Sequence, residues 1–254
     1  MGVRDGRTVL GGLRQEGCLK ARFPRPVDWP EVVSLNTSGG IAGGDVLASE
    51  IVVAAGARAT FAAQASERFY RVLPGDLPSR VRTSLAIGEA AAAEWLPQET
   101  ILFDRCAVDR RLDVMLDAGA WFLGVEMLVF GRAAMGESVA QGHVADTIRL
   151  FREGSLLLHD TIRMSGPIAK MLARPAIANR GRAVATVVHV AADAESRIDA
   201  VRAALDGFEA GASAWNGMLL ARIVAPDGAR LRAAVVAGLA VLRDGRALPR
   251  VWMC

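Results

Sequence analysis

A short pattern recurs along the chain: an alternating apolar run, a small turn centred on glycine, and a second apolar run. Its five copies are centred on Gly56, Gly88, Gly119, Gly154 and Gly228, and the first four glycines lie 32, 31 and 35 positions apart. A nearly constant period of this length indicates stacked supersecondary units, each of which buries its apolar face against the next unit. The repeat therefore restricts the chain to a repetitive, β-rich fold.

Alternating apolar residues on both sides of a glycine turn are typical of antiparallel hairpins. We therefore expect a mainly β fold in which stacked β-hairpins form an irregular β-helix or solenoid-like domain. An ordinary β-sandwich, in which the regular spacing would be a coincidence, is the alternative. No linker rich in serine and glycine divides the sequence, so residues 1–254 are expected to form a single domain. Residues 73–80 and 164–175 read as exposed loops.

Two helices are expected, both in the C-terminal third. In residues 192–211, Asp193 or Ser196 can cap the start of a helix with Ile198, Val201, Leu205 and Phe208 on one face, and Gly211 can end it. Residues 229–243 form the second candidate, which a turn sequence follows directly. These helices are expected to close one end of the β-stack or to form a docking surface.

Composition excludes several classes of function. Thirty basic and 27 acidic residues give a formal net charge of +3 without a basic run, so neither nucleic acid nor a membrane surface is an expected partner. No apolar stretch approaches the ~20 residues of a spanning helix. The three cysteines, Cys18, Cys106 and Cys254, are odd in number and widely spaced, which favours a reducing cytoplasm over a disulfide framework.

The glycine-rich stretch LNTSGGIAGGD, residues 35–45, resembles a ligand-binding loop only superficially. It lacks the lysine and hydroxyl of a phosphate-binding loop and the GxGxxG spacing of a dinucleotide fingerprint. Paired glycines are better explained by a chain reversal or by close backbone packing. Asp45, which ends the stretch, is then expected either to cap its own turn or to face a cavity.

Nothing in the sequence indicates a catalytic centre or a tight metal site. No GxSxG elbow surrounds a serine, and no HxH, HxxxH or CxxC supports a metal. Carboxylates embedded in apolar sequence are more informative, because a buried carboxylate needs a partner. They could line an internal channel that holds a divalent cation loosely through oxygen ligands, or they could pair with arginines. These residues are Glu94, Glu99, Asp104, Glu126 and Asp160.

Four segments, in order, resemble one known family. GGIAGGD, QASERFYR, EWLPQETILFD and the closing LPRVW are similar to the UreD/UreH family of urease accessory proteins, as is LRQEGCLKARFP near the start. WLPQETILFD is specific, whereas the glycine motif alone would be weak. The similarity covers essentially the whole chain. Cys18 departs from the family pattern, so no role is assigned to its thiol.

The resemblance implies a maturation factor that is not an enzyme and that has no tightly bound cofactor. Family members bind the urease apoprotein and the accessory protein UreF, which recruits the GTPase UreG, and nickel is thought to pass through an internal channel towards urease. The positions of this sequence that match the family motifs supply six candidate residues for lining the channel: Asp45, Ser66, Glu67, Glu94, Glu99 and Asp104. Glu126 and Asp160 join them from the pattern of carboxylates in apolar strands. Few histidines suit transit of nickel better than storage.

Two other functions stay open at this point. A scaffold could bridge urease and UreF without contacting nickel, and it would tolerate changes to these carboxylates. A β-helix enzyme that acts on glycans could use two of Glu94, Asp104 and Glu126 as acid and base. Such enzymes bind sugars on a ladder of exposed aromatic side chains, and the single tyrosine of this sequence argues against one.

Overall fold

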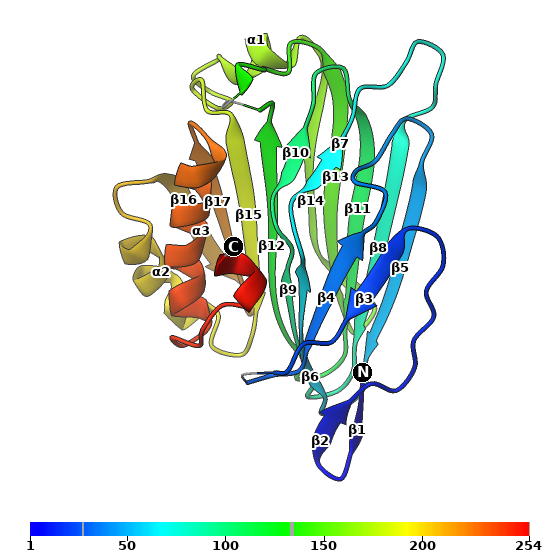
Figure 1. The fold of residues 1–254 in the computed structure, drawn as a ribbon. Helices are drawn as coiled ribbons and strands as arrows, with labels where there is room; N and C mark the ends of the chain where they lie inside the picture. The colour runs from blue at the N-terminus through cyan, green and yellow to red at the C-terminus, as the bar shows by residue number, and fades with distance from the viewer. Residues whose placement is uncertain (27, 133–134, 254) are drawn as a thin grey trace.

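A computed structural model describes residues 1–26, 28–132 and 135–253 as a mainly β structure in which two large sheets face each other. The two longer helices cover one outer side of the stack, the shortest helix lies at one end of it, and a small hairpin projects at the other end (Figure 1). The hairpin pairs β1 (Gly2–Arg4) with β2 (Arg7–Val9).

The larger sheet runs in the order β16-β17-β15-β12-β9-β6-β4-β3, with β10 attached to β12 and β7 attached to β10. Its ten strands, counted over the described residues, are β3 (Leu19–Arg22), β4 (Glu31–Asn36), β6 (Arg58–Ala63), β7 (Glu67–Phe69), β9 (Ala92–Leu96), β10 (Thr100–Leu102), β12 (Trp121–Phe130), β15 (Ala183–Val190), β16 (Glu209–Trp215) and β17 (Met218–Ala225). The smaller sheet runs β14-β13-β11-β8-β5. Its strands are β5 (Val46–Val53), β8 (Ser79–Ile87), β11 (Ala107–Leu116), β13 (Gly142–Arg152) and β14 (Ser155–Gly166).

The expected stacking is confirmed, but the first three units are not hairpins. The turns at Gly56, Gly88 and Gly119 carry the chain from β5 to β6, from β8 to β9 and from β11 to β12, each time from the smaller sheet to the larger one. Successive units then pair in parallel within each sheet, and Val53 and Leu116 both pair with Ile87. Alternation alone cannot distinguish a hairpin from such an arch, because both have a period of two.

The last two copies of the pattern differ from the first three. The turn at Gly154 joins β13 and β14 as a true antiparallel hairpin. The prediction of a fifth β unit is wrong, because Gly228 begins a helix. Asp227 caps that helix by accepting a hydrogen bond from the backbone N–H of Arg230 at 2.8 Å, which is the usual role of an aspartate at this position.

Three α-helices are present in the described residues, where two were expected. They are α1 (Ile168–Leu172), α2 (Ile198–Ala204) and α3 (Gly228–Leu242), and short 3₁₀ turns cover Glu195–Arg197 and Arg250–Met253. The prediction for 229–243 is confirmed. The helix expected over residues 192–211 is much shorter, because residues from Glu209 onward pair with β17 as strand β16. The supposed loop over residues 164–175 contains α1.

Apolar side chains fill two kinds of space. Between the sheets they form two clusters, one around Val114, Phe122 and Leu150 and the other around Val108, Leu128 and Phe130. A third cluster joins the outer face of β12, β15 and β17 to α2 and α3, which lie against these strands in Figure 1. The two clusters between the sheets are separated by a layer of charged side chains.

Gly88 has a packing role that a substitution can test. A Cβ at this position would lie 2.7 Å from the backbone nitrogen of Ala55 in the preceding turn, so stacked turns leave no room for it. Gly88→Ala should lower the free energy of unfolding by about 2 kcal/mol, the usual cost of overpacking, as measured by urea denaturation. Gly211→Ala on β16, where nothing lies within 4 Å of the added carbon, should change stability little. Equal effects of the two variants would contradict the close stacking.

Candidate functional site

Arg110 lies at the centre of the charged layer between the sheets. Its Nε and Nη2 donate to the two carboxylate oxygens of Asp146 at 2.7 and 2.8 Å, and its Nη1 donates to Thr100 Oγ1 at 2.8 Å. The same Nη1 lies 2.8 Å from Glu126 Oε2, and Trp95 Nε1 donates to Glu126 Oε1 at 2.8 Å. The network joins strands of both sheets, so it connects the two halves of the stack across their interior.

The alternation of the strands explains why these groups meet. Arg110 lies between the inward-facing Val108 and Leu112 on β11, and it pairs in parallel register with Asp146 on β13. Glu126 lies on β12, in the opposite sheet. The side chains of Arg110, Glu126 and Asp146 are only 14, 7 and 6% exposed. Charges buried to this extent are tolerated only where partners compensate the lost hydration.

Glu67 brings a third carboxylate to the layer. It pairs in parallel register with Thr100, and Asn36 Nδ2 lies 3.3 Å from both of its oxygens. It is half-buried, and no ion pair to it is found among the described residues. We call Glu67, Thr100, Arg110, Glu126 and Asp146 the interior polar layer.

The electrostatics of the interior polar layer follow from burial. Burial raises the pKa of Glu67 and of Glu126, and the neighbouring Asp146 charge adds to the rise at Glu126 while Arg110 opposes it. Burial also acts to lower the pKa of Arg110, but the carboxylates outweigh it and raise that pKa further. The guanidinium therefore stays charged; it contacts Glu126 and Asp146 directly, and the charge of Glu67 acts on it without an ion pair.

Glu94 lies outside the interior polar layer, on the side of the sheet that faces the helices. It is fully buried, and it binds Arg243 Nε at 2.8 Å, Arg246 Nη2 at 2.9 Å and the Thr60 hydroxyl at 2.6 Å. Arg243 directly follows α3. The carboxylate therefore binds the C-terminal segment to β9. For Glu94, the expectation that an embedded carboxylate pairs with arginines is confirmed.

Ser66 and Glu99 meet each other on the same helix-facing side. The hydroxyl of Ser66 donates to Glu99 Oε2 at 3.2 Å, and Arg232 on α3 donates to Glu99 Oε1 at 2.9 Å. Arg232 also donates to the backbone oxygen of Trp252, whose indole nitrogen donates to Leu96 at 3.0 Å. These contacts join the WLPQE and LPRVW segments, which are far apart in the sequence.

The other candidates lie apart from the interior polar layer. Asp160 on β14 accepts two hydrogen bonds from Arg222 Nη2, at 2.7 and 2.6 Å. Asp104 accepts a hydrogen bond from the backbone N–H of Gln141 at 3.0 Å. Of the eight candidates, Glu67 and Glu126 lie together in the interior polar layer and Ser66 and Glu99 contact each other, whereas Asp45, Glu94, Asp104 and Asp160 lie apart from them.

Asp45 is exposed and caps its own turn. Its Oδ2 accepts a hydrogen bond from the backbone N–H of Ala42 at 2.8 Å, and its own N–H donates to the carbonyl of Ala42 at 3.2 Å. Gly40 in the same stretch has φ of +155°, and a Cβ there would lie 2.5 Å from the ring of Tyr70. The glycines are thus explained by close packing, as expected. A place for Asp45 in a nickel path stays a prediction.

Sequence reasoning missed Arg110 and Asp146, which hold the interior polar layer together. The sequence does indicate that both are inward-facing, because each occupies a position at which its alternating strand otherwise has an apolar residue. Arg110 does so in AVDRRLDVML and Asp146 in HVADTIRL. A charge on an inward position of an alternating strand is a sharper signal of a buried network than a carboxylate within an apolar run.

A metal cage is absent from the part of the chain that the structure describes, since no three His, Cys, Asp or Glu side chains are grouped so as to hold an ion. None of the described helices is long and apolar enough to cross a membrane.

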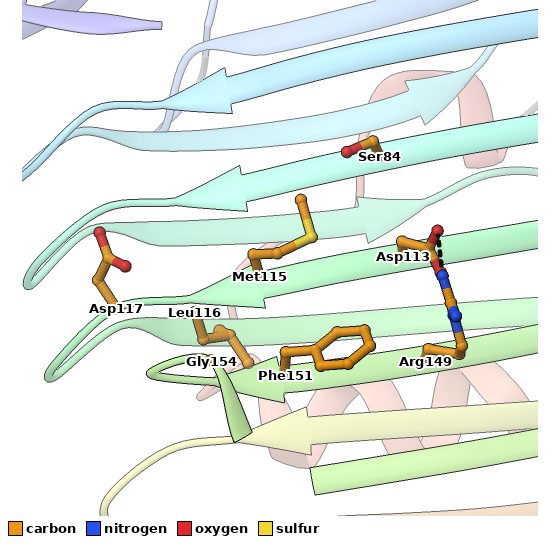
Figure 2. A pocket seen from close by; sticks show the side chains of 8 residues that line it. All are labelled: Ser84, Asp113, Met115, Leu116, Asp117, Arg149, Phe151 and Gly154. Carbon is orange, nitrogen blue, oxygen red and sulfur yellow. Dashed lines mark hydrogen bonds and ion pairs between the residues drawn. The ribbon is translucent and has the colours of Figure 1, made fainter. Parts of the chain in front are cut away.

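A hollow of about 320 Å³ lies on the outer face of the smaller sheet, away from the interior polar layer. Figure 2 shows Asp113 on β11 joined to Arg149 on β13 within it. Although partial burial acts to raise it, the hydrogen bonds from Arg149 and the charge of Arg111 hold the pKa of Asp113 below its usual range. This carboxylate is already satisfied, so the hollow adds no candidate site. Its lining comprises Ser84, Asp113, Met115, Leu116, Asp117, Arg149, Phe151 and Gly154.

Comparison with known proteins defines the class. The family model described as UreD urease accessory protein matches residues 1–253. Proteins named urease accessory protein UreD are 47% identical in Bradyrhizobium diazoefficiens, over 99% of this chain and 90% of the relative, and 45% identical in Xanthobacter autotrophicus, over 97% and 85%. Such matches define accessory proteins of urease rather than enzymes. The chain belongs to the UreD family, which agrees with the resemblance of its four segments.

The Arg110 network makes a stability prediction. Arg110→Met leaves two buried carboxylates without their cation, so the free energy of unfolding should fall by roughly 3 to 5 kcal/mol, the range for breaking a buried pair. Arg80→Met removes an arginine whose side chain is 59% exposed and which lies 3.7 Å from Asp109, and it should cost at most about 1 kcal/mol. Urea denaturation at neutral pH measures both. Losses of similar size would contradict the central role of Arg110.

His189 on β15 makes a prediction about pH. The ring is fully buried, Nδ1 lies 3.2 Å from the carbonyl of Phe122, and Nε2 has no hydrogen-bond partner among the described residues. Burial, helped by the charge of Arg197, lowers its pKa from 6.5 to about 4. Between pH 6.5 and pH 4 the histidine therefore binds a proton in the unfolded chain but stays neutral in the folded chain. The free energy of unfolding should fall as the pH falls through this range, by roughly 3 kcal/mol in total.

Denaturation measured between pH 7 and pH 4 tests this expectation. His189→Leu should flatten the slope of stability against pH in that window, whereas His159→Leu, at an exposed position on β14, should keep it. An unchanged slope in His189→Leu would show that other groups cause the loss.

Proposed function

We propose that this chain is a urease maturation factor that works in the cytoplasm. It binds the urease apoprotein and UreF, reaches UreG through UreF, and helps to deliver nickel to the urease active site through its own interior. Nickel is its cargo and not a resident cofactor, and neither nucleic acid nor a membrane takes part.

One observation carries the nickel part of the proposal: the interior polar layer contains three carboxylates and a single guanidinium. Glu126 and Asp146 contact Arg110, and Glu67 lies beside Thr100 without an ion pair among the described residues, so the layer has an excess of negative charge when its carboxylates are ionised. A divalent cation would supply the missing positive charge. Oxygen ligands suit a cation that must be released, because histidine and thiolate ligands bind nickel more firmly.

The carboxylates of the interior polar layer differ in how deeply they are buried, which suggests the order in which a cation would meet them. Glu67 is half-buried and is held by the amide of Asn36, whereas Glu126 and Asp146 are nearly inaccessible. We infer that a cation meets Glu67 first and reaches the inner carboxylates by competing with Arg110. This competition keeps any binding weak, which suits transit.

The scaffold alternative also has support. Glu94, Glu99 and Asp160 are each bound to arginines that connect separate elements. Their contacts account for them as structural residues that hold the stack, its helices and its C-terminal segment together. A scaffold that only bridges urease and UreF would use the same contacts and would not need Glu67.

Glu67→Gln separates the two functions. It removes a charge from the layer without breaking an ion pair found among the described residues, so the fold and the complex with urease and UreF should survive. We expect the urease recovered from co-purified complexes to contain severalfold less nickel, measured by metal analysis, and to be correspondingly less active. Glu126→Gln should have the same effect.

Glu16→Gln, at an exposed position near the amino terminus, is the matched control for loss of one negative charge. Thermal unfolding of each variant checks that the fold is retained. Normal nickel content in complexes carrying Glu67→Gln and Glu126→Gln would remove nickel from the proposal and leave the scaffold.

A further inference from the structure

We propose that the apolar pocket beside α1, with the basic residues around it, binds an acidic segment of a partner protein that inserts an apolar side chain. The proposal goes beyond nickel delivery and does not depend on it, because the pocket and its rim are separate from the interior polar layer. The partner is defined by its chemistry: glutamate or aspartate beside leucine, isoleucine or phenylalanine.

The pocket is a cavity of about 290 Å³ where the edge strand β14 faces β15 and β17. Most of its lining is apolar, and Ile177 at its rim is 39% exposed. Ligand pockets begin at about 300 Å³, so this cavity suits one or two large side chains better than an extended molecule. Its lining is Phe130, Thr161, Ile162, Met164, Leu172, Ile177, Ala178, Gly181, Ala183, Val184, Arg222 and Val224.

The rim is strongly basic. Residues 161–192 contain no aspartate or glutamate, and four exposed cations lie among the pocket residues over residues 170–182. Lys170 lies on α1 with the lining residue Leu172, Arg174 lies between Leu172 and Ile177 in the sequence, and Arg180 and Arg182 flank Gly181. We call Lys170, Arg174, Arg180 and Arg182 the basic rim.

The basic rim differs from the other arginine-rich surfaces of the molecule. On the outer face of the smaller sheet, Arg80 and Arg82 pair with Asp109, and Arg111 and Arg149 pair with Asp113. Within the part of the chain that the structure describes, no ion pair involves a residue of the basic rim. Four uncompensated charges around an apolar opening leave the complementary charges to a partner.

The loop that carries the basic rim has a defined backbone. Arg180 donates from its N–H to the carbonyl of Leu172 at 2.9 Å, and Asn179 donates to Arg174 at 3.1 Å. A Cβ on Gly181 would lie 2.5 Å from Val224, so the loop packs closely against β17. A surface that is ordered before binding loses less conformational freedom when it binds.

One charged side chain, that of Arg222, also lines the pocket. Arg222 on β17 lines the cavity and is bound through Nη2 to Asp160 on β14. This pair spans the two sheets and satisfies both groups. The basic rim, and not Arg222, therefore supplies the attraction for an acidic partner, while the apolar lining supplies the contact for its side chain.

Two peptide pools test the proposal on the full chain. Each contains 15-residue amphipathic peptides with Leu, Ile or Phe at positions i, i+3, i+4 and i+7, and the other positions are mainly Glu in one pool and Lys in the other. We expect the full chain to bind the Glu pool and not the Lys pool in fluorescence anisotropy, and added salt should weaken the binding. Arg174→Glu/Arg180→Glu should weaken it by about tenfold, and Ile177→Asp should also weaken it.

The matched control is Arg4→Glu/Arg7→Glu on the β1–β2 hairpin, which lies at the opposite end of the molecule from α1 (Figure 1). It makes the same change in net charge and should leave binding unchanged. Equal loss in the control, binding of neither pool, or stronger binding of a single-stranded RNA or of vesicles containing phosphatidylserine would each overturn the proposal. Thermal unfolding verifies that each variant is folded.

Discussion

Parallel stacking of the arches places each inward side chain directly beside the inward side chain of the next unit. Val53, Ile87 and Leu116 follow this rule in the apolar part of the stack. Arg110 follows it in the charged part, where register brings it beside Asp146 and the opposite sheet supplies Glu126. An inward charge in such a stack cannot turn to solvent, so it is tolerated only when its neighbours compensate it. The arrangement of the interior depends on this constraint.

Two sets of ion pairs hold different parts of the structure. The Arg110 network joins the two sheets across their interior, whereas Glu94 and Glu99 join the larger sheet to α3 and to the C-terminal segment. The second set explains why the WLPQE and LPRVW segments occur together: they contact each other through Gln98, Glu99, Arg232 and Trp252. A motif that resembles a functional signature is, over much of its length, an anchor for the end of the chain.

Membership of the UreD family places the chain among urease accessory proteins, and the two proposals assign cargo and docking to separate regions of it. The interior polar layer has the charge excess and the oxygen ligands suited to a cation in transit. The basic rim beside α1 has uncompensated charge and an apolar opening suited to a protein segment. These regions use different residues, so substitutions can test cargo and docking independently.

The sequence by itself determined the mainly β class, the stacked repeat, the helix near residues 229–243 and the family, because each depends on local pattern or on motifs that can be read in order. It also limited Asp45 to two roles, of which the capping hydrogen bond to Ala42 is found. Only the tertiary structure decided that the first three glycine turns are arches, since alternation is the same in an arch and in a hairpin. It also decided which charges meet. Arg110 finds Asp146 and Glu126 across strands far apart in the chain, and such pairings depend on register, which is fixed when the two sheets pack and not by any local run of residues.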